Sequence, residues 1–335
     1  MLTTIMQAAR MNSLVLISMV LAMMGALGVH AADAPWKPTK PVEIVIGAQP
    51  GGAHDRSGRV LQKILTDTGA VNVPVNVINK PGQGQAIAVA YTNAHAADAH
   101  YLIVLGSSWV TTAINTGSST SHRDLTPITK LFDTDLVLYV PAGSTLRTIR
   151  DMADALVKGN APMSFGFSTS AGNASHIVLA EIARMSGYDA RKLRVVVNAS
   201  GSITATQVAG GHISAGISSS GSAQSMSSTG KIRLIGAIAP HRFPQLPELP
   251  TLKEQGYDVV AATWFNVFGP KGMTPTQAAW WEAVIHKAMR HADAKKFADA
   301  NNWSIELTGA KELPAQLDRE YAKLRKTLVE LGMAH

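Results

Sequence analysis

A glycine turn that leads into a histidine and an aspartate is the segment whose residue types most clearly suit binding of a small molecule. It spans residues 49–55 and follows the apolar, β-branched run 42–46. Gly51 and Gly52 would let a ligand approach the backbone closely, although an ordinary tight turn needs the same glycines. A strand that turns into a helix directs backbone N–H groups and the positive helix end to one point, which suits a carboxylate or phosphate.

Four further segments rich in hydroxyl and amide groups follow predicted strands. They are Ser107 with Ser108, residues 168–176, residues 198–202 and residues 218–222. One such loop is ordinary turn chemistry, and part of 168–176 must cap a helix in any case. Open α/β sheets bind ligands where strands end and helices begin, so five such junctions in one chain favour a binding site.

Sequence signals for catalysis are weak. The chain has no G-x-S-x-G elbow, no H-E-x-x-H motif, no P-loop lysine and no cysteine. His176 could serve Ser168 or Ser170 as a base in a hydrolase, but no local geometry enforces that contact. His286 and His291 do not share one helix face, so they do not suggest a zinc site. We expect no enzyme activity, no cofactor and no metal.

The elements that must position these junctions alternate between apolar runs and helical patterns. The first series is 42–46, 55–66, 73–78, 84–95 and 101–105, and the second runs from 163 to 238. This alternation predicts βαβ units and largely parallel sheets in an α/β fold.

The chain of 335 residues, 46% of them hydrophobic, is long enough for two domains. Residues 117–130 break the pattern before a predicted strand at 135–141, and four prolines between 240 and 250 mark a return linker. We expect one domain of residues 32–135 and 250–335, and a second of residues 136–249. A capping box at 274–277 marks the start of the C-terminal helices. We expect these helices to pack on the first domain, and we expect no third series of strands.

The N-terminus has the composition of a cleavable export signal. Arg10 precedes an apolar run at 14–27, and small residues at 29–31 suit cleavage after Ala31. A membrane anchor at 11–29 is the alternative. Because the chain lacks cysteine, we expect neither disulfides nor a lipid anchor, and a diffusible protein in the periplasm.

The charge pattern argues against nucleic-acid binding. The formal net charge is +7, and removal of Arg10 with the signal lowers it by one. The 30 Lys and Arg residues are scattered, and only 6% of residues are aromatic. This balance favours a mild attraction for anionic solutes.

Ordered motifs across the mature chain resemble those of the Bug-type substrate-binding proteins of tripartite tricarboxylate transporters. The motifs lie at 40–46, 50–55, 79–82, 101–106, 165–176, 210–213, 230–235, 249–256 and 268–272. The resemblance implies a two-lobed periplasmic binding protein of type II character, each lobe a mainly parallel sheet flanked by helices, joined by a hinge of two strands. It also implies that the lobes close on a carboxylate and that the partner is a membrane permease.

The residues expected to bind the ligand come from the junctions and from this resemblance. They are Gln49, Gly51, Gly52, His54, Asp55, Ser107, Ser108, Ser168, Thr169, Ser170, Asn173, His176, Asn198, Gly201 and Ser218. Since like charges repel, Asp55 is expected to fix the first loop rather than touch an anion.

Some choices stay open at the level of sequence. Residues 197–201 and Ser214 depart from common family patterns, which leaves the ligand undefined among tricarboxylates, C4 dicarboxylates and aromatic acids. Low aromatic content favours a polar aliphatic acid.

The roles of three side chains also stay open. Trp109 could line the binding site or pack in the core. Arg56 and Arg59 could meet carboxylates, or form a surface or interdomain ion pair. We expect a monomer that serves a permease or, alternatively, a sensor kinase.

Overall fold

The computed structural model describes residues 36–118, 120–159, 162–259 and 261–334, and the expected signal segment lies outside them. From Lys37 onward the chain forms one compact unit. Among the described residues, no helix combines the length and apolar character needed to cross a membrane.

The first lobe is built on a parallel sheet in the order β2-β1-β3. Its strands are β1 (Val42–Ile46), β2 (Val75–Asn79) and β3 (Tyr101–Gly106), and the helices α2 (Ala53–Asp67), α3 (Ala86–Asn93) and α4 (Ser108–Thr116) follow them in turn. Ile44 lies between Val77 and Leu102 in the register. The prediction of βαβ units is confirmed here, and a short 3₁₀ turn at Gln83–Gln85 precedes α3.

The second lobe repeats this arrangement. Its strands are β5 (Ser164–Ser168), β6 (Arg194–Asn198), β7 (Ala215–Ser219) and β8 (Ile232–Ile238), and its helices are α5 (Ile149–Lys158), α6 (Ala174–Met185), α7 (Gly201–Ala209) and α8 (Ser220–Ser227). β5 pairs in parallel with β6 and β7. Helices α5 and α6 cover one face of this sheet, and α7 and α8 cover the other.

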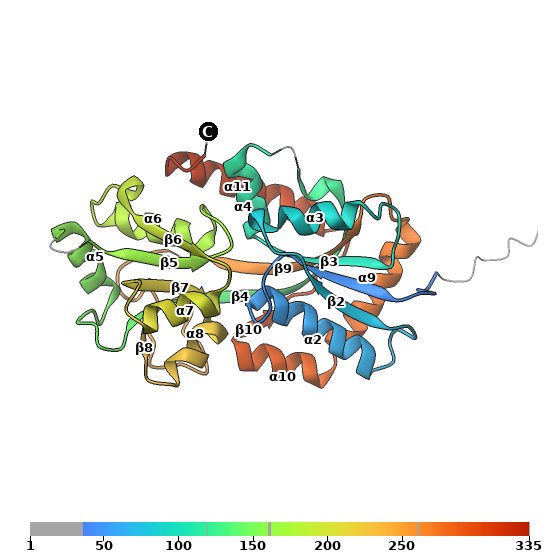
Figure 1. Ribbon diagram of the computed structural model, residues 1–335, viewed down its shortest axis with the longest axis horizontal. Coiled ribbons are helices and arrows are strands. Elements are labelled where there is room, and N and C mark those ends of the chain that lie inside the picture. The colour runs from blue at the N-terminus through green and yellow to red at the C-terminus, as the bar shows by residue number, and fades with distance from the viewer. Residues whose placement is uncertain (1–35, 119, 160–161, 260, 335) are drawn as a thin grey trace, which may run out of the picture. The chain divides into compact units, whose positions relative to one another are not determined.

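Two long antiparallel strands join the lobes, β4 (Leu125–Pro141) and β9 (Ala262–Pro270). β4 pairs with β9 as far as Asp135, and from Leu136 onward it pairs with β7 and β8 instead. Figure 1 shows the two strands running between the lobes. The predicted fold class, two mainly parallel sheets joined by a two-strand hinge, is therefore confirmed.

Two details of the predicted element order were wrong. β4 begins at Leu125 rather than at residue 135, because Leu125, Ile128 and Leu131 are buried against neighbouring strands. Strands also follow the proline-rich segment, namely β9 and the short β10 (Trp303–Ile305), which pairs with β4. β9 lies between β3 and β4, so the side chains of residues 264–268 are buried on both faces and show no alternation.

The C-terminal helices pack on the first lobe, as expected. They are α9 (Pro275–Met289), α10 (Ala292–Asn301) and α11 (Leu313–Glu330). The predicted capping box is present, since Thr274 and Gln277 each bond the other's backbone N–H. Trp281 of α9 donates its indole N–H to the carbonyl of Ala99 at 2.8 Å. In Figure 1, α3, α4 and α11 lie on one side of the first sheet and α2 and α10 on the other.

The core of the first lobe includes Trp109, which is 2% exposed and meets Phe268 edge to face with ring centroids 6.1 Å apart. It packs with Val45 of β1 and Leu317 of α11 in one buried cluster. Of the two roles considered for Trp109, the structure shows core packing.

Candidate functional site

A cavity of about 60 Å³ lies where the carboxyl ends of β1, β3, β5 and β7 meet the crossing strands. Both lobes contribute to its wall. The expected site residues that line it are Gly52, His54, Ser107, Ser108, Ser168, Thr169, Asn173, Gly201 and Ser218. Strand ends of parallel sheets converge in this way, so residues far apart in sequence reach one place.

The other expected residues lie outside this wall. Gln49 and Asn198 line a neighbouring cavity of about 230 Å³ together with Pro81 and Gln85. The two cavities share Ala48, Thr169 and Ala199. Gly51, Asp55, Ser170 and His176 line neither cavity.

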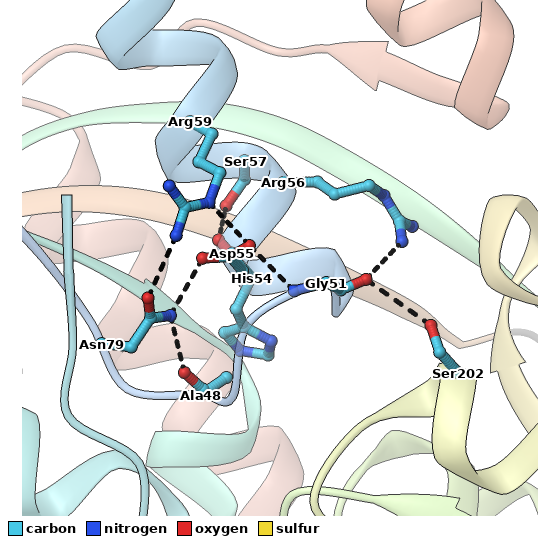
Figure 2. A network of polar contacts seen from close by, with 9 residues as sticks. All are labelled: Ala48, Gly51, His54, Asp55, Arg56, Ser57, Arg59, Asn79 and Ser202. Atoms are coloured by element: carbon cyan, nitrogen blue, oxygen red, sulfur yellow. Dashed lines mark hydrogen bonds and ion pairs between the residues drawn. The ribbon is translucent and has the colours of Figure 1, made fainter.

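Asp55 orders the first loop through a set of hydrogen bonds (Figure 2). Its carboxylate accepts the backbone N–H of Gly51 at 2.9 Å, Nε of Arg59 at 2.8 Å and Nδ2 of Asn79 at 2.9 Å. Burial alone would raise the pKa of Asp55, but the bonds from Arg59, Gly51 and Asn79 outweigh burial and lower it. The predicted role of Asp55 in fixing the loop is confirmed.

Asn79 connects this network to the end of β1, because its Nδ2 also donates to the carbonyl of Ala48 at 2.9 Å. Arg59 forms an ion pair with Asp55 one turn earlier on α2, so the ion-pair interpretation holds for Arg59. Arg56 differs: no ion pair of its guanidinium is found among the described residues, so that interpretation was wrong for Arg56. It bonds the carbonyl of Gly51 and the hydroxyl of Ser222 instead.

His54 is a buried, neutral side chain in the cavity wall. Its ring meets Phe265 edge to face with centroids 4.8 Å apart, and its Nε2 is buried without a hydrogen-bond partner. Burial lowers the pKa of His54 to about 4, so the imidazole is uncharged at neutral pH. A Cβ at Gly106 would lie 2.4 Å from Nε2, so the close approach of this ring requires glycine there.

Asn173 organises the loop that follows β5. Its Oδ1 accepts the backbone N–H of His176 at 3.1 Å, which caps α6. Its Nδ2 donates to the carbonyl of Ser168 at 2.6 Å and to Oγ1 of Thr169 at 3.2 Å. Thr169 has a φ of +80°, a left-handed conformation that is strained for a threonine. Strain held by several bonds is typical of functional loops.

The Ser–His pair that a hydrolase would need is not formed in this loop. His176 Nδ1 accepts the backbone N–H of Gly172 at 2.9 Å, and the ring stacks on Phe167 at 5.3 Å. The Ser170 hydroxyl is buried without a hydrogen-bond partner. Burial lowers the pKa of His176 to about 4. This ring is a packed structural side chain rather than a base directed at a serine.

The loops before α7 and α8 bring serine hydroxyls to the opposite wall. Ser200 caps α7 by accepting the backbone N–H of Ile203 at 3.3 Å. Gly201 lies so close to β7 that an added Cβ would be 2.8 Å from Cβ of Ser218. The Ser219 hydroxyl donates to Oγ of Ser222 at 3.1 Å. All of these residues except Ile203 line the cavity.

Sequence reasoning missed the part of the wall that comes from the crossing strands, namely Thr134 and Leu136 of β4 and Thr263 and Phe265 of β9. Four other wall residues lie in the predicted junction segments but were not chosen individually: Ser175, Ser200, Ser219 and Ser222. Each pair on the crossing strands has a spacing of two, which places both side chains on one face. That spacing could have identified them only after the two strands had been located.

Hydrogen bonds join the lobes on both sides of the cavity. Nδ2 of Asn115 donates to the carbonyl of Ala171 at 2.7 Å, and Oγ of Ser220 donates to the carbonyl of Asn301 at 2.9 Å. Near the first loop, Ser202 approaches the Gly51 carbonyl at 3.5 Å (Figure 2). The residues that line the cavity include no lysine, arginine, aspartate or glutamate. No group of three or more metal-ligating side chains occurs among the residues the structure describes.

The fold and the interlobe cavity define a periplasmic binding protein with two lobes. The family model described as "Tripartite tricarboxylate transporter family receptor" matches residues 59–331, and the chain belongs to this family. Protein BugT of Bordetella pertussis is 28% identical over 290 residues, which cover 84% of this chain and 86% of BugT. A Cupriavidus necator protein described as "UPF0065 protein in gbd 5'region" is 28% identical over 331 residues, or 92% and 94% of the two chains.

Solved structures share the fold at low sequence identity. Periplasmic binding protein BugD has a TM-score of 0.81 and 16% identity, covering 89% of this chain and 99% of BugD. MatC from Rhodopseudomonas palustris with bound malate has a TM-score of 0.76 and 17% identity, with coverage of 87% and 99%. The R. palustris protein Rpa4515 with adipate has a TM-score of 0.79 and 18% identity, with coverage of 89% and 99%.

Proposed function

We propose that this protein captures a small carboxylate between its lobes in the periplasm and delivers it to the permease subunits of a tripartite tricarboxylate transporter. The observation that carries the proposal is the cavity walled by hydroxyl and amide groups from both lobes. Membership of the receptor family supports the transport role. The malate and adipate named for two structures of the same fold support a carboxylate as the solute.

The chemistry of the wall suits an anion held by neutral donors. Serine and threonine hydroxyls can each donate one hydrogen. α2 and α7 begin in the wall at Ala53 and Gly201, and the N–H groups of a first helical turn have no partner within the helix, although Ser200 accepts that of Ile203 in α7. Bonds from such donors to an ionised carboxylate are shorter and stronger than neutral ones. Because His54 is uncharged at neutral pH, it adds no positive charge to this wall.

The size and composition of the site favour a short polar acid. Besides the ring of His54, Phe265 is the one aromatic side chain in the cavity wall. The adjoining cavity behind Ala48 and Thr169 could take the far end of a longer dicarboxylate. We therefore favour aliphatic di- or tricarboxylates over aromatic acids, with no catalysis and with a monomer as the working form.

The domain boundaries belong to the same proposal. We assign residues 32–135 and 250–335 to the first lobe and residues 136–249 to the second. The exchange of strand partners by β4 between Asp135 and Leu136 supports this boundary. Closure about β4 and β9 would then bring the two walls onto the ligand.

The test is a binding screen of residues 32–335 against malate, adipate, citrate and terephthalate. A ligand that binds the folded state raises the melting temperature by mass action, and calorimetry then gives the dissociation constant. Thr263→Trp should abolish the response, because it fills the cavity from β9. Thr66→Trp, on the exposed face of α2, is the matched control and should respond like the wild type. A folded, ligand-free protein that responds to none of the acids would overturn the proposal.

A further inference from the structure

The side chain of Arg56 crosses from the first lobe to the wall of the cavity. It starts in the first turn of α2, and its Nη2 donates to Oγ of Ser222, in the first turn of α8, at 3.2 Å. Its Nη1 donates to the carbonyl of Gly51 at 3.0 Å (Figure 2). Ser222 is 4% exposed and lines the cavity. A cation thus lies directly behind a hydroxyl of a wall that contains no charged side chain.

The hydrogen bonds at Ser222 determine which way its own hydrogen can point. A hydroxyl has two lone pairs and one hydrogen. Oγ of Ser222 accepts from Nη2 of Arg56 and from Oγ of Ser219 at 3.1 Å, so both lone pairs are occupied. Among the described residues no acceptor for the Ser222 hydrogen is found. The hydrogen is therefore free for an acceptor in the cavity that Ser222 lines.

Among the described residues, the guanidinium of Arg56 forms no ion pair with a carboxylate. Asp55, its neighbour in the chain, directs its oxygens to Gly51, Arg59 and Asn79 instead. Nε of Arg56 is buried without a hydrogen-bond partner, and the guanidinium lies 5.9 Å from the ring centroid of Trp303. Burial lowers the pKa of Arg56, the nearby negative charge of Asp55 partly offsets this, and a guanidinium stays protonated in proteins. A half-buried positive charge, with no ion pair to a carboxylate in the part of the chain that the structure describes, therefore lies beside the cavity.

We propose that Arg56, acting through Ser222, is the positioning residue that makes the cavity selective for an anion over a neutral molecule of the same shape. The guanidinium orients and polarises the Ser222 hydroxyl, which then donates to one carboxylate oxygen of the bound solute. This inference rests on the proposed function and names the group that supplies its charge selectivity. When a cation donates a hydrogen bond to a hydroxyl, that hydroxyl becomes a stronger donor in its own hydrogen bond, here from Ser222 to the ligand.

The hydrogen bonds at Ser222 connect residues from different lobes. Arg56 comes from α2, whereas Ser219 and Ser222 come from the end of β7 and from α8. Arg56 can polarise the Ser222 hydroxyl only while the two lobes are in contact. Loss of Arg56 should therefore raise the rate of ligand release more than it lowers the rate of capture.

The test compares acids with their neutral amides. Calorimetry is done with malate, adipate and citrate, each beside its full amide, on the wild type and on Arg56→Gln, Arg56→Lys and Ser222→Ala. We expect Arg56→Gln and Ser222→Ala to weaken acid binding by about tenfold to a hundredfold, with amide binding changed less than about threefold. Arg56→Lys keeps the charge and should restore part of the selectivity. Lys63→Gln, an exposed change of the same charge on α2, is the control and should bind like the wild type.

A double variant tests the route through Ser222. If Arg56 acts through that hydroxyl, Arg56→Gln with Ser222→Ala should weaken acid binding little more than either change alone, and additive losses would overturn the inference. Equal losses for acids and amides, or an Arg56→Gln protein that binds like Lys63→Gln, would overturn it too, while the proposed function would stand. A wild type that binds none of the acids would overturn both.

Discussion

The carboxylate of Asp55 holds the backbone N–H of Gly51 at 2.9 Å, four residues before it in the chain. This bond closes the first loop on the N-terminus of α2 and leaves the next residue, Gly52, in the cavity wall. Because Asp55 also bonds Asn79 at the end of β2, the loop is tied to two strands of the sheet. The Asp55 carboxylate thus orders the loop, and the cavity wall that Gly52 joins contains no lysine, arginine, aspartate or glutamate.

Asp55→Asn should lower stability at pH 7 by about 1–3 kcal/mol, since buried bonds to an ionised acceptor are lost. The pKa of Asp55 is lowered in the folded protein, so its contribution is present above the ordinary value of 3.8 and is lost as the pH falls through the folded value. The wild type and the variant should therefore converge in acid. Urea denaturation at pH 7 and in acid measures this.

The control for Asp55 is Asp67→Asn in the last turn of α2, where the carboxylate pairs with an exposed Lys63. That pair is solvent-exposed, and its loss should change stability by less than about 1 kcal/mol. Equal effects of the two substitutions would contradict the special role of Asp55.

The buried histidines should make the protein less stable in mild acid. Burial lowers the pKa of His54 and of His176 from 6.5 to about 4. As the pH falls from about 6.5 to 4, the unfolded chain takes up protons that the folded protein does not. Unfolding is therefore favoured across this window, by up to about 3 kcal/mol for each histidine.

His54→Gln and His176→Gln should each flatten the dependence of stability on pH. Denaturation midpoints between pH 7.5 and 4.5 measure this effect, with the difference from the wild type isolating each ring from other titrating groups. If both variants follow the wild-type curve in parallel, these histidines are not the source of the acid sensitivity.

Much of the site could be predicted because its signals are local. The glycines before α2, the serines after β3 and the cap of α6 each lie within a few residues of a strand end, and parallel strands bring their carboxyl ends together. The role of Asp55 was predictable for the same reason, since it acts on Gly51 across a single turn.

The crossing strands could not be predicted in this way. Trp264, Phe265, Val267 and Phe268 of β9 are all buried, so the strand lacks the alternation that identifies a half-exposed strand. Its place between β3 and β4 is set by pairing with distant segments. The bond from Arg56 to Ser222 likewise joins two helices from different lobes, and no local pattern indicates it.

Gly201→Ala should narrow the cavity and destabilise the second lobe. An added Cβ would lie 2.8 Å from Cβ of Ser218, so α7 must move away from β7 or Ser218 must shift into the cavity. We expect a loss of about 1–3 kcal/mol in stability and weaker acid binding. Gly143→Ala is the control, because a Cβ there has open space and the backbone is not left-handed. Thermal unfolding and calorimetry on both variants measure this, and identical behaviour would contradict it.

Two substitutions at Asn173 should separate the cap of α6 from the wall of the cavity. Asn173→Ala removes the acceptor for the His176 N–H and should lower stability by about 1 kcal/mol. Asn173→Asp keeps an acceptor at the helix N-terminus, so it should lose less stability at the helix end. It also places a negative charge in the wall, where it repels a carboxylate.

The two variants should differ most clearly in ligand binding. In thermal unfolding without ligand, both should be less stable than the wild type, because Asn173→Asp keeps the cap but turns a carboxylate oxygen toward the Ser168 carbonyl that Nδ2 bonded. In calorimetry with malate or adipate, Asn173→Asp should be the weaker binder. Raising the salt concentration should recover part of the binding of Asn173→Asp and leave that of Asn173→Ala nearly unchanged, because screening acts on the added charge. If both variants bind the acids equally well, the Asn173 side chain does not face the bound anion, and the second-lobe wall of the site must be assigned to other residues.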